Sequence, residues 1–167
     1  MVNVAINGAS GRMGRALIEA CLLNDETTVT AAIERPGSPA IGADAGSIAG
    51  LNMLDVAVRD SLNNAEYDVL IDFTRPEVTQ DNLKTCIEAG KSMVIGTTGF
   101  DSAGIQLIHN AAKKIPVVFA PNMSVGVNVC LRLLEIAAQA LGENSDIEIT
   151  EAHHRHKLDA PSGTALR

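Results

Sequence analysis

Five consecutive residues near the end of the chain can carry positive charge, although the formal net charge of the whole protein is −7. They are His153, His154, Arg155, His156 and Lys157. Residues 162–164 follow and read Ser-Gly-Thr, which predicts a helix opening whose hydroxyl caps the first turn and whose backbone N–H groups face an anion. Histidine can donate a proton near neutral pH, and a nearby lysine adds positive charge. The stretch therefore predicts an anion pocket beside a proton donor.

Two other interpretations fit the same stretch. A solvated basic loop followed by an ordinary capped helix would show the same residues. The three histidines could also suggest a metal site, but successive residues on one loop rarely all face one ion, and the sequence shows no second ligand cluster. We therefore expect no metal. The upstream sequence has to decide between an anion pocket and a plain loop.

A second pattern that could do chemistry lies at the amino-terminal end. An apolar run at residues 2–6 leads directly into residues 8–14, which read Gly-Ala-Ser-Gly-Arg-Met-Gly. Glycines at this spacing, between a strand and a helix, are a variant of the dinucleotide fingerprint. Glu34 ends the next expected strand, where an acidic side chain can bind ribose hydroxyls. Arg35 comes next and could hold a ribose phosphate, so NADH and NADPH are both admissible.

Short apolar segments alternate with amphipathic ones along most of the chain. The alternation predicts an open, mostly parallel sheet covered by helices on both faces, with ligands bound outside the carboxyl ends of the strands. Residues 36–50 are rich in Gly, Ala, Ser and Pro and predict an irregular loop. Residues 147–149 predict one more strand. The segments expected to be strands before it are 2–6, 28–33, 69–71, 92–95 and 117–120, with a weak one at 56–58.

Three of the expected strands end in unusual loops. In a parallel sheet these loops share one rim, where they would meet the nicotinamide end of a dinucleotide. Ordinary turn chemistry is the alternative, because Gly, Thr, Pro and Asn are common turn residues. The loops are Phe73-Thr74, Gly96-Thr97-Thr98 and Ala120-Pro121-Asn122-Met123.

Composition narrows the class of protein. The chain has 167 residues, of which 46% are hydrophobic and 2% aromatic. An acidic chain with few rings argues against nucleic-acid binding. No apolar run approaches the about 20 residues of a membrane span, so we expect a cytoplasmic protein without membrane contact. Cys21, Cys86 and Cys130 are far apart and are expected to be free, buried thiols.

Five motifs together resemble the dihydrodipicolinate reductase family, also called 4-hydroxy-tetrahydrodipicolinate reductase. The resemblance spans the whole chain in the same order, and the last motif is the most specific. The motifs are the glycine loop, Asp-Phe-Thr-Arg-Pro, Gly-Thr-Thr-Gly-Phe, Ala-Pro-Asn-Met-Ser-Val-Gly-Val-Asn and Glu-Ala-His-His-Arg-His-Lys-Leu-Asp-Ala-Pro-Ser-Gly-Thr-Ala.

The resemblance implies a Rossmann-like, doubly wound parallel sheet and a cytoplasmic enzyme of lysine and diaminopimelate biosynthesis. Such an enzyme reduces a cyclic dicarboxylate with NADH or NADPH, generally as a homotetramer. It further implies that His153 is the proton donor, that Lys157 is a cationic stabiliser, and that His154, Gly163 and Thr164 bind substrate carboxylates. The residues that it assigns to the cofactor are Gly8, Ala9, Ser10, Gly11, Arg12, Met13, Glu34, Arg35, Phe73, Thr74, Gly96, Thr97, Thr98, Ala120, Pro121, Asn122 and Met123.

The resemblance also predicts two domains. Residues 1–125 would form the dinucleotide-binding domain, and residues 126–167 the beginning of an α+β domain for substrate binding and oligomerisation. Family members continue well beyond the last motif, so we expect the second domain to be incomplete in this chain. The alternative to an active reductase is a truncated dinucleotide-binding module without turnover.

Overall fold

The computed structural model describes residues 1–155 and 160–166. His156 and Lys157, two members of the cationic stretch, lie outside the described residues. The chain divides into two compact units, Met1–Phe119 and Ala120–Arg167.

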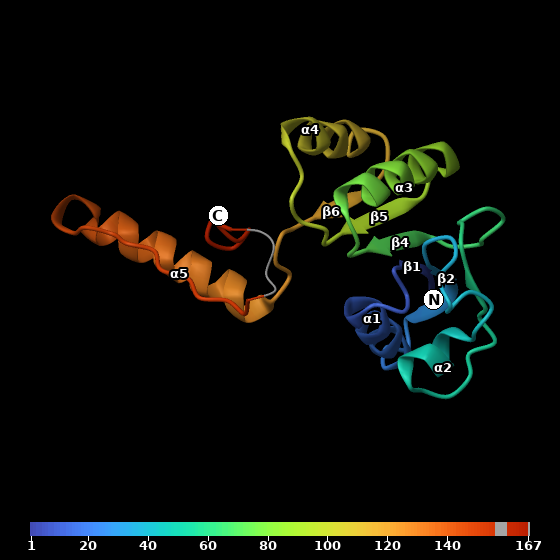
Figure 1. Cartoon of the computed structure of the whole chain (residues 1–167). Helices are drawn as coiled ribbons and strands as arrows, with labels where there is room; N and C mark the ends of the chain where they lie inside the picture. Colours follow the sequence, from blue (N-terminus) through green and yellow to red (C-terminus); the bar gives the residue numbers. More distant parts are fainter. Residues whose placement is uncertain (156–159, 167) are drawn as a thin grey trace. The chain divides into compact units, whose positions relative to one another are not determined.

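The first unit is built on one sheet of parallel strands (Figure 1). The order across the sheet is β3-β2-β1-β4-β5-β6. The chain therefore adds β2 and β3 on one side of β1, and then β4, β5 and β6 on the other side. The reversal between β1 and β4 is a topological switch point, where sheets of this kind bind ligands. The strands are β1 (Val2–Asn7), β2 (Thr27–Ile33), β3 (Val58–Arg59), β4 (Val69–Asp72), β5 (Ser92–Ile95) and β6 (Val117–Phe119).

Helices cover both faces of this sheet, as predicted. α1 (Arg12–Leu22) and α2 (Ala45–Ala49) lie on one face, and α3 (Pro76–Ala89) and α4 (Ser102–Ala111) lie on the other (Figure 1). Successive residues of β1 point to opposite faces, because Val4 and Ile6 belong to the core under α1 whereas Ala5 belongs to the core under α3 and α4. The doubly wound, Rossmann-like fold is confirmed.

Local sequence signals set the helix ends. Pro76 occupies the first turn of α3, and Gly90 ends the helix with a positive φ of 63°. Asp101 caps α4 by accepting a hydrogen bond from the N–H of Gly104 at 2.7 Å. Each of these residues is of a type that favours a helix start or end at its position.

One helix was not expected. Residues 36–50 were predicted to form an irregular loop, but they contain α2. The Asp44 side chain caps this helix through the N–H of Ser47, and Gly50 ends it in the left-handed region. Asp44 also accepts hydrogen bonds from the N–H groups of Leu54 and Val56, so it ties the helix to the next segment. The prediction was wrong because the run of Ala, Gly and Ser masked an ordinary capped turn of helix.

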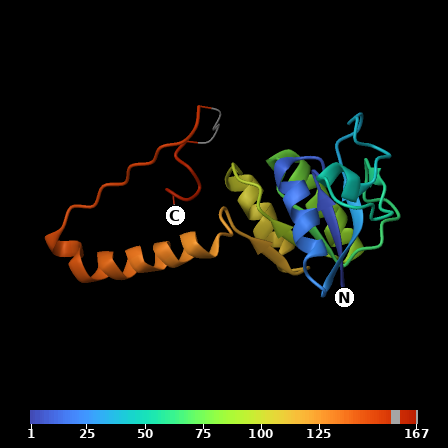
Figure 2. The same cartoon turned by 90° about the horizontal axis from the view of Figure 1, so that it is seen from below.

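The second unit contains α5 (Val125–Leu141) and the short 3-10 helix η1 (Gly142–Asn144). After η1 the chain turns back toward the amino-terminal end of α5 (Figure 2). The strand expected at residues 147–149 is absent from the described structure, and Ile147 and Ile149 are exposed. A strand requires a partner strand for its backbone groups, and the described part of the second unit offers none.

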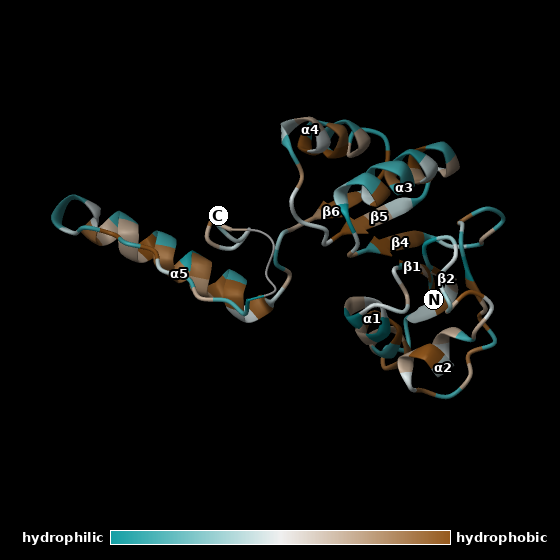
Figure 3. Cartoon of the chain, viewed as in Figure 1, coloured by the Kyte–Doolittle hydropathy of each residue, from teal (hydrophilic) through white to brown (hydrophobic). Residues whose placement is uncertain are grey.

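The apolar residues of α5 recur at a spacing that is typical of a helix packed against a core. Figure 3 shows hydrophobic residues spread along the helix, yet within the described structure none of its residues is buried. By length and composition alone, the segment Val125–Asn144 could cross a membrane, with a mean hydropathy of 1.4. The expectation that no run approaches this length was therefore wrong. One such helix is weak support for a membrane span, because core helices of soluble proteins meet the same criterion.

Candidate functional site

A cleft opens at the carboxyl ends of β1, β2 and β4, with a volume of about 780 Å³. Sequence-predicted residues from three separate loops line it: Gly8, Ser10, Gly11, Glu34, Arg35, Phe73 and Thr74. The sequence analysis missed further lining residues, namely Asn7, Ile33, Pro36, Asp60, Ser61, Arg75, Val78 and Asn82. Most of these adjoin a predicted residue in sequence or follow the end of a strand, which is the signal that could have found them.

The glycine loop has the backbone geometry that its motif predicts. Gly8 adopts a positive φ of 73°, and its N–H donates to the carbonyl of Ile33 at 2.9 Å. A Cβ atom on Gly14 would lie 2.2 Å from the carbonyl oxygen of Gly8, so only glycine lets α1 pack this closely on the loop. Ala9 is buried in the core, whereas Arg12 and Met13 are exposed on the first turn of α1.

The carboxylate of Glu34 reaches across the cleft to the glycine loop. Its Oε1 atom accepts hydrogen bonds from the backbone N–H of Ser10 at 2.9 Å and from the Ser10 hydroxyl at 2.6 Å. Its Oε2 atom accepts one from the N–H of Arg35 at 3.2 Å. Residues 24 positions apart are thereby held together at the end of β2.

Asp72, the last residue of β4, is a fully buried carboxylate with several hydrogen-bond donors. Its Oδ2 atom accepts from the side-chain amides of Asn7 and Asn82, both at 3.1 Å. Its Oδ1 atom accepts from the N–H of Thr74 at 2.9 Å and from the Thr74 hydroxyl at 2.6 Å. This arrangement satisfies the buried charge and fixes Thr74 at the mouth of the cleft.

The loop after β5 supports Phe73 and Thr74 from behind. A Cβ atom on Gly96 would lie 2.0 Å from the Phe73 ring, so the absent side chain leaves the space that the ring occupies. The buried Thr97 hydroxyl bonds to the N–H of Thr74 and to the Thr79 hydroxyl, each at 2.9 Å. Thr98 is exposed. Gly96 and Thr97 therefore shape the cleft through their neighbours.

In the second unit, the described structure brings Asn122 and Thr164 together. The Asn122 amide donates to the Thr164 hydroxyl at 3.2 Å, across 42 positions of sequence. Asn122 also accepts from the N–H of Ser124 at 2.9 Å. Pro121 is exposed, and Met123 is 38% exposed. Ala120 is half-buried.

The remaining candidate residues surround Glu151, which the sequence analysis did not assign. Its Oε1 atom accepts from the N–H of Ser162 at 2.8 Å, and its Oε2 atom lies 3.6 Å from Nδ1 of His153. The Ser162 hydroxyl accepts a hydrogen bond from the N–H of Ala165 at 3.2 Å. The segment that follows, including Gly163 and Thr164, forms a turn in the described structure rather than the expected helix.

His154 is exposed, and Lys157 lies outside the described residues. Within the described structure there is no group of three His, Cys, Asp or Glu side chains placed to hold a metal ion.

Cys21 and Cys86 are buried free thiols, as expected, but Cys130 is exposed on α5. Its apolar neighbours in sequence predicted burial, but they are themselves exposed.

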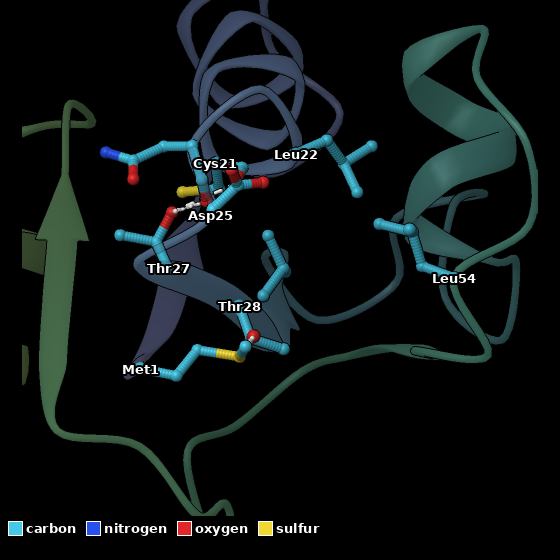
Figure 4. A pocket seen from close by; sticks show the side chains of 9 residues that line it. Met1, Cys21, Leu22, Asp25, Thr27, Thr28 and Leu54 are labelled. Atoms are coloured by element: carbon cyan, nitrogen blue, oxygen red, sulfur yellow. Dashed lines mark hydrogen bonds between the residues drawn. The ribbon is translucent and has the colours of Figure 1, made fainter.

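A second, smaller hollow of about 270 Å³ lies at the amino ends of β1 and β2 (Figure 4). Met1, Cys21, Leu22, Thr28 and Leu54 are among its lining residues. Burial raises the pKa of the Cys21 thiol, and a hydrogen bond with Thr27 opposes that rise. The hollow contains none of the residues that the sequence analysis selected.

The parallel sheet, the glycine loop and the acidic residue at the end of β2 define a Rossmann-like α/β protein of the dinucleotide-binding type. Family models then identify the protein family within this class. The model for the dihydrodipicolinate reductase N-terminus matches residues 2–123, and the model for the C-terminus matches residues 126–167. The chain belongs to the dihydrodipicolinate reductase family.

Individual relatives agree with this assignment. The chain is 58% identical to a 4-hydroxy-tetrahydrodipicolinate reductase of Pseudomonas fluorescens and 56% identical to one of Methylococcus capsulatus. Both alignments cover 100% of this chain and 63% of the relative, so the chain spans less than two thirds of these proteins.

Solved structures show the same fold. A dipicolinate-bound dihydrodipicolinate reductase from Paenisporosarcina sp. TG-14 has a TM-score of 0.70 and 29% identity, over 99% of this chain and 63% of that one. An aspartate semialdehyde dehydrogenase with NADP from Candida albicans has a TM-score of 0.58 and 15% identity, over 85% and 48%. The second likeness concerns the fold alone.

Proposed function

We propose that this chain supplies the cofactor site and the catalytic loop of an NAD(P)H-dependent reductase that converts 4-hydroxy-tetrahydrodipicolinate to tetrahydrodipicolinate, in lysine and diaminopimelate biosynthesis. The observation that carries the proposal is the meeting of the glycine loop and Glu34 at the switch point of the sheet. The family and the 58% identity to a named reductase support it.

The cleft fits a dinucleotide. Gly8 has the turn conformation and Gly14 the close helix contact that bring backbone N–H groups toward a pyrophosphate. In the proposal, residues 8–13 bind the phosphates, and Glu34 and Arg35 bind the adenosine ribose. Phe73, Thr74, residues 96–98 and residues 120–123 bind the nicotinamide side. When bound, NADH or NADPH supplies a hydride.

The second unit would supply the proton and the positive charge. We assign the proton to His153, whose Nδ1 lies near the Glu151 carboxylate, an arrangement that can orient the ring. Lys157 would stabilise developing negative charge. His154, Gly163 and Thr164 would bind the substrate carboxylates, and the Asn122–Thr164 hydrogen bond would link this group to the nicotinamide-side loop.

The remaining parts of the proposal concern the whole protein. We propose a cytoplasmic homotetramer, at full length, that acts on a small cyclic dicarboxylate and binds neither nucleic acid nor membrane. We also propose a division of labour between residues 1–125, which bind the dinucleotide, and residues 126–167, which begin the substrate domain.

A second candidate function is dinucleotide binding without turnover. The observation in its favour is the contrast between a first unit with its own core and an α5 helix that buries none of its residues in the described structure. In this case the chain would retain Glu34 and the glycine loop as a working site, while His153 would not be held in a catalytic position.

One experiment separates the two functions. The oxidation of NADH and of NADPH by the 167-residue chain would be followed with freshly made 4-hydroxy-tetrahydrodipicolinate, beside a direct cofactor titration on the same sample. Turnover supports the reductase. Binding without turnover supports the second candidate, and the absence of both contradicts the cofactor site itself.

A further inference from the structure

Ser10 holds the Glu34 carboxylate by two separate groups. Its backbone N–H and its hydroxyl both donate to the same oxygen, Oε1, at 2.9 and 2.6 Å. Short O–H···O⁻ contacts are among the stronger hydrogen bonds in proteins because the acceptor carries a full charge. Both side chains are half-buried, so the pair is partly shielded from competing water. The side chain of Glu34 is thereby given one defined position.

The other oxygen of the carboxylate remains able to accept. Oε2 receives the N–H of Arg35 at 3.2 Å, and a carboxylate oxygen has room for about two donors. One hydroxyl of a ribose can therefore donate to this oxygen without displacing Ser10. Glu34 needs no rearrangement to meet a ribose with free hydroxyls.

A ribose that carries a phosphate is repelled by the Glu34 carboxylate. The phosphate brings negative charge to a carboxylate that cannot readily move away, because Ser10 holds it in the cleft. Arg35 lines the same cleft, is exposed, and within the described structure its guanidinium has no hydrogen-bond or ion-pair partner. A phosphate that pairs with Arg35 in this cleft would still meet the negative charge of the Glu34 carboxylate. The position of Glu34 thus decides between the two cofactors.

We propose that Ser10 is a specificity-determining residue that sets a preference for NADH over NADPH by fixing Glu34 in the ribose corner. The inference rests on the proposed function, since it names the cofactor of that site. Ser10 acts through Glu34 and is a positioning residue.

The test measures binding of each nucleotide by its own fluorescence, using the 167-residue chain and Ser10→Ala. Loss of a hydrogen bond to a charged group should raise the Kd for NADH by about 5- to 10-fold, and leave that for NADPH unchanged or lower. Ser10→Thr keeps the hydroxyl and should keep the preference. Ser47→Ala, an exposed serine of α2 outside the cleft, is the matched control.

A double-mutant cycle shows whether Ser10 acts through Glu34. In a Glu34→Gln background, Ser10→Ala should change the ratio of the two Kd values by less than about 2-fold, because no charge remains to be positioned. Equal weakening of both nucleotides, or the same ratio change in both backgrounds, would show that Ser10 contacts the cofactor directly and would overturn the inference.

Two further outcomes are distinguishable. A wild-type chain that binds NADPH more tightly than NADH overturns the inference and leaves the reductase standing. A wild-type chain that binds neither nucleotide overturns the proposed function, and the inference with it.

Discussion

The two units secure their polar residues in different ways. In the first, the Asp72 and Glu34 carboxylates lie at the carboxyl ends of β4 and β2, the strands on either side of β1, and accept from donors on other elements, including Asn7 on β1 and Asn82 on α3. In the second, Glu151 and His153 lie 3.6 Å apart on one extended segment, and the His153 side chain is 41% exposed. The sheet prearranges the cleft that we propose for the cofactor, whereas the proposed catalytic segment depends on contacts along a short stretch of chain.

The largest expected effect concerns His153. If it is the proton donor, His153→Ala should lower turnover of 4-hydroxy-tetrahydrodipicolinate by about two to four powers of ten. The melting temperature and the Kd for NADH should stay near the wild-type values, because the His153 side chain is exposed and belongs to neither hydrophobic core of the described residues. Steady-state kinetics and a cofactor titration check both parts.

His109→Ala is the matched control, since His109 is an exposed histidine on α4. It should leave turnover unchanged. Turnover that survives in the His153 variant within about 2-fold would remove His153 from the role of general acid.

The next effect concerns the stability of the first unit. Asp72→Ala would leave the donors of Asn7, Thr74 and Asn82 without their buried acceptor, so we expect a loss of about 3 kcal/mol in the free energy of unfolding. Urea unfolding at neutral pH measures it. Asp81→Asn breaks an exposed pair with Lys84 and should cost less than about 0.5 kcal/mol. Equal losses would mean that burial of the carboxylate is not the cause.

Two glycines test the contrast between units more finely. In Gly14→Ala the added carbon would meet backbone of the glycine loop, at a cost of about 1–3 kcal/mol. In Gly126→Ala, at the start of α5, the added carbon would meet only the Ser124 hydroxyl at 3.9 Å. The higher helix propensity of alanine should then raise the free energy of unfolding by about 0.5 kcal/mol. Thermal unfolding of both variants checks the sign. A destabilised Gly126 variant would indicate a contact that α5 makes in solution.

The smallest effect is a dependence on pH. Burial raises the pKa of Asp44, but hydrogen bonds from the N–H groups of Ser47, Leu54 and Val56 outweigh it, so the net pKa is lowered. The stabilisation is therefore full above the unfolded-state value of about 4 and is lost as the pH falls through the lower folded-state pKa. Asp44→Asn should lower the melting temperature at pH 7 and have less effect near pH 3. An equal difference at both values would contradict this assignment.

Most of the first unit could be predicted because its signals are local. Pro76, Gly90 and Asp101 mark helix ends, and the apolar runs mark the strands. α2 escaped prediction although Asp44 and Gly50 bracket it, because five residues of helix leave little periodicity. The strand expected at residues 147–149 is absent since alternation alone does not provide a partner strand.

The candidate site was predictable by residue type and less so by contact. The glycine loop and Glu34 were selected from their spacing, but their direct hydrogen bonds join positions 24 apart. The Asp72 network was not foreseen, because the sequence does not show which side-chain amides of β1 and α3 reach a buried carboxylate. Glu151 was missed because the prediction for this segment considered only the basic residues beside it.

The buried Asp72 carboxylate also limits how this protein can be redesigned. Thr74 takes its position from β4, from Thr97 beyond β5 and, through the shared acceptor, from Asn7 and Asn82. A loop transplanted from another Rossmann protein would bring its own side chains without the donors that match this acceptor. Exchange of the loop that contains Phe73 and Thr74 should therefore succeed only when positions 7, 72, 82 and 97 are transferred with it as one block.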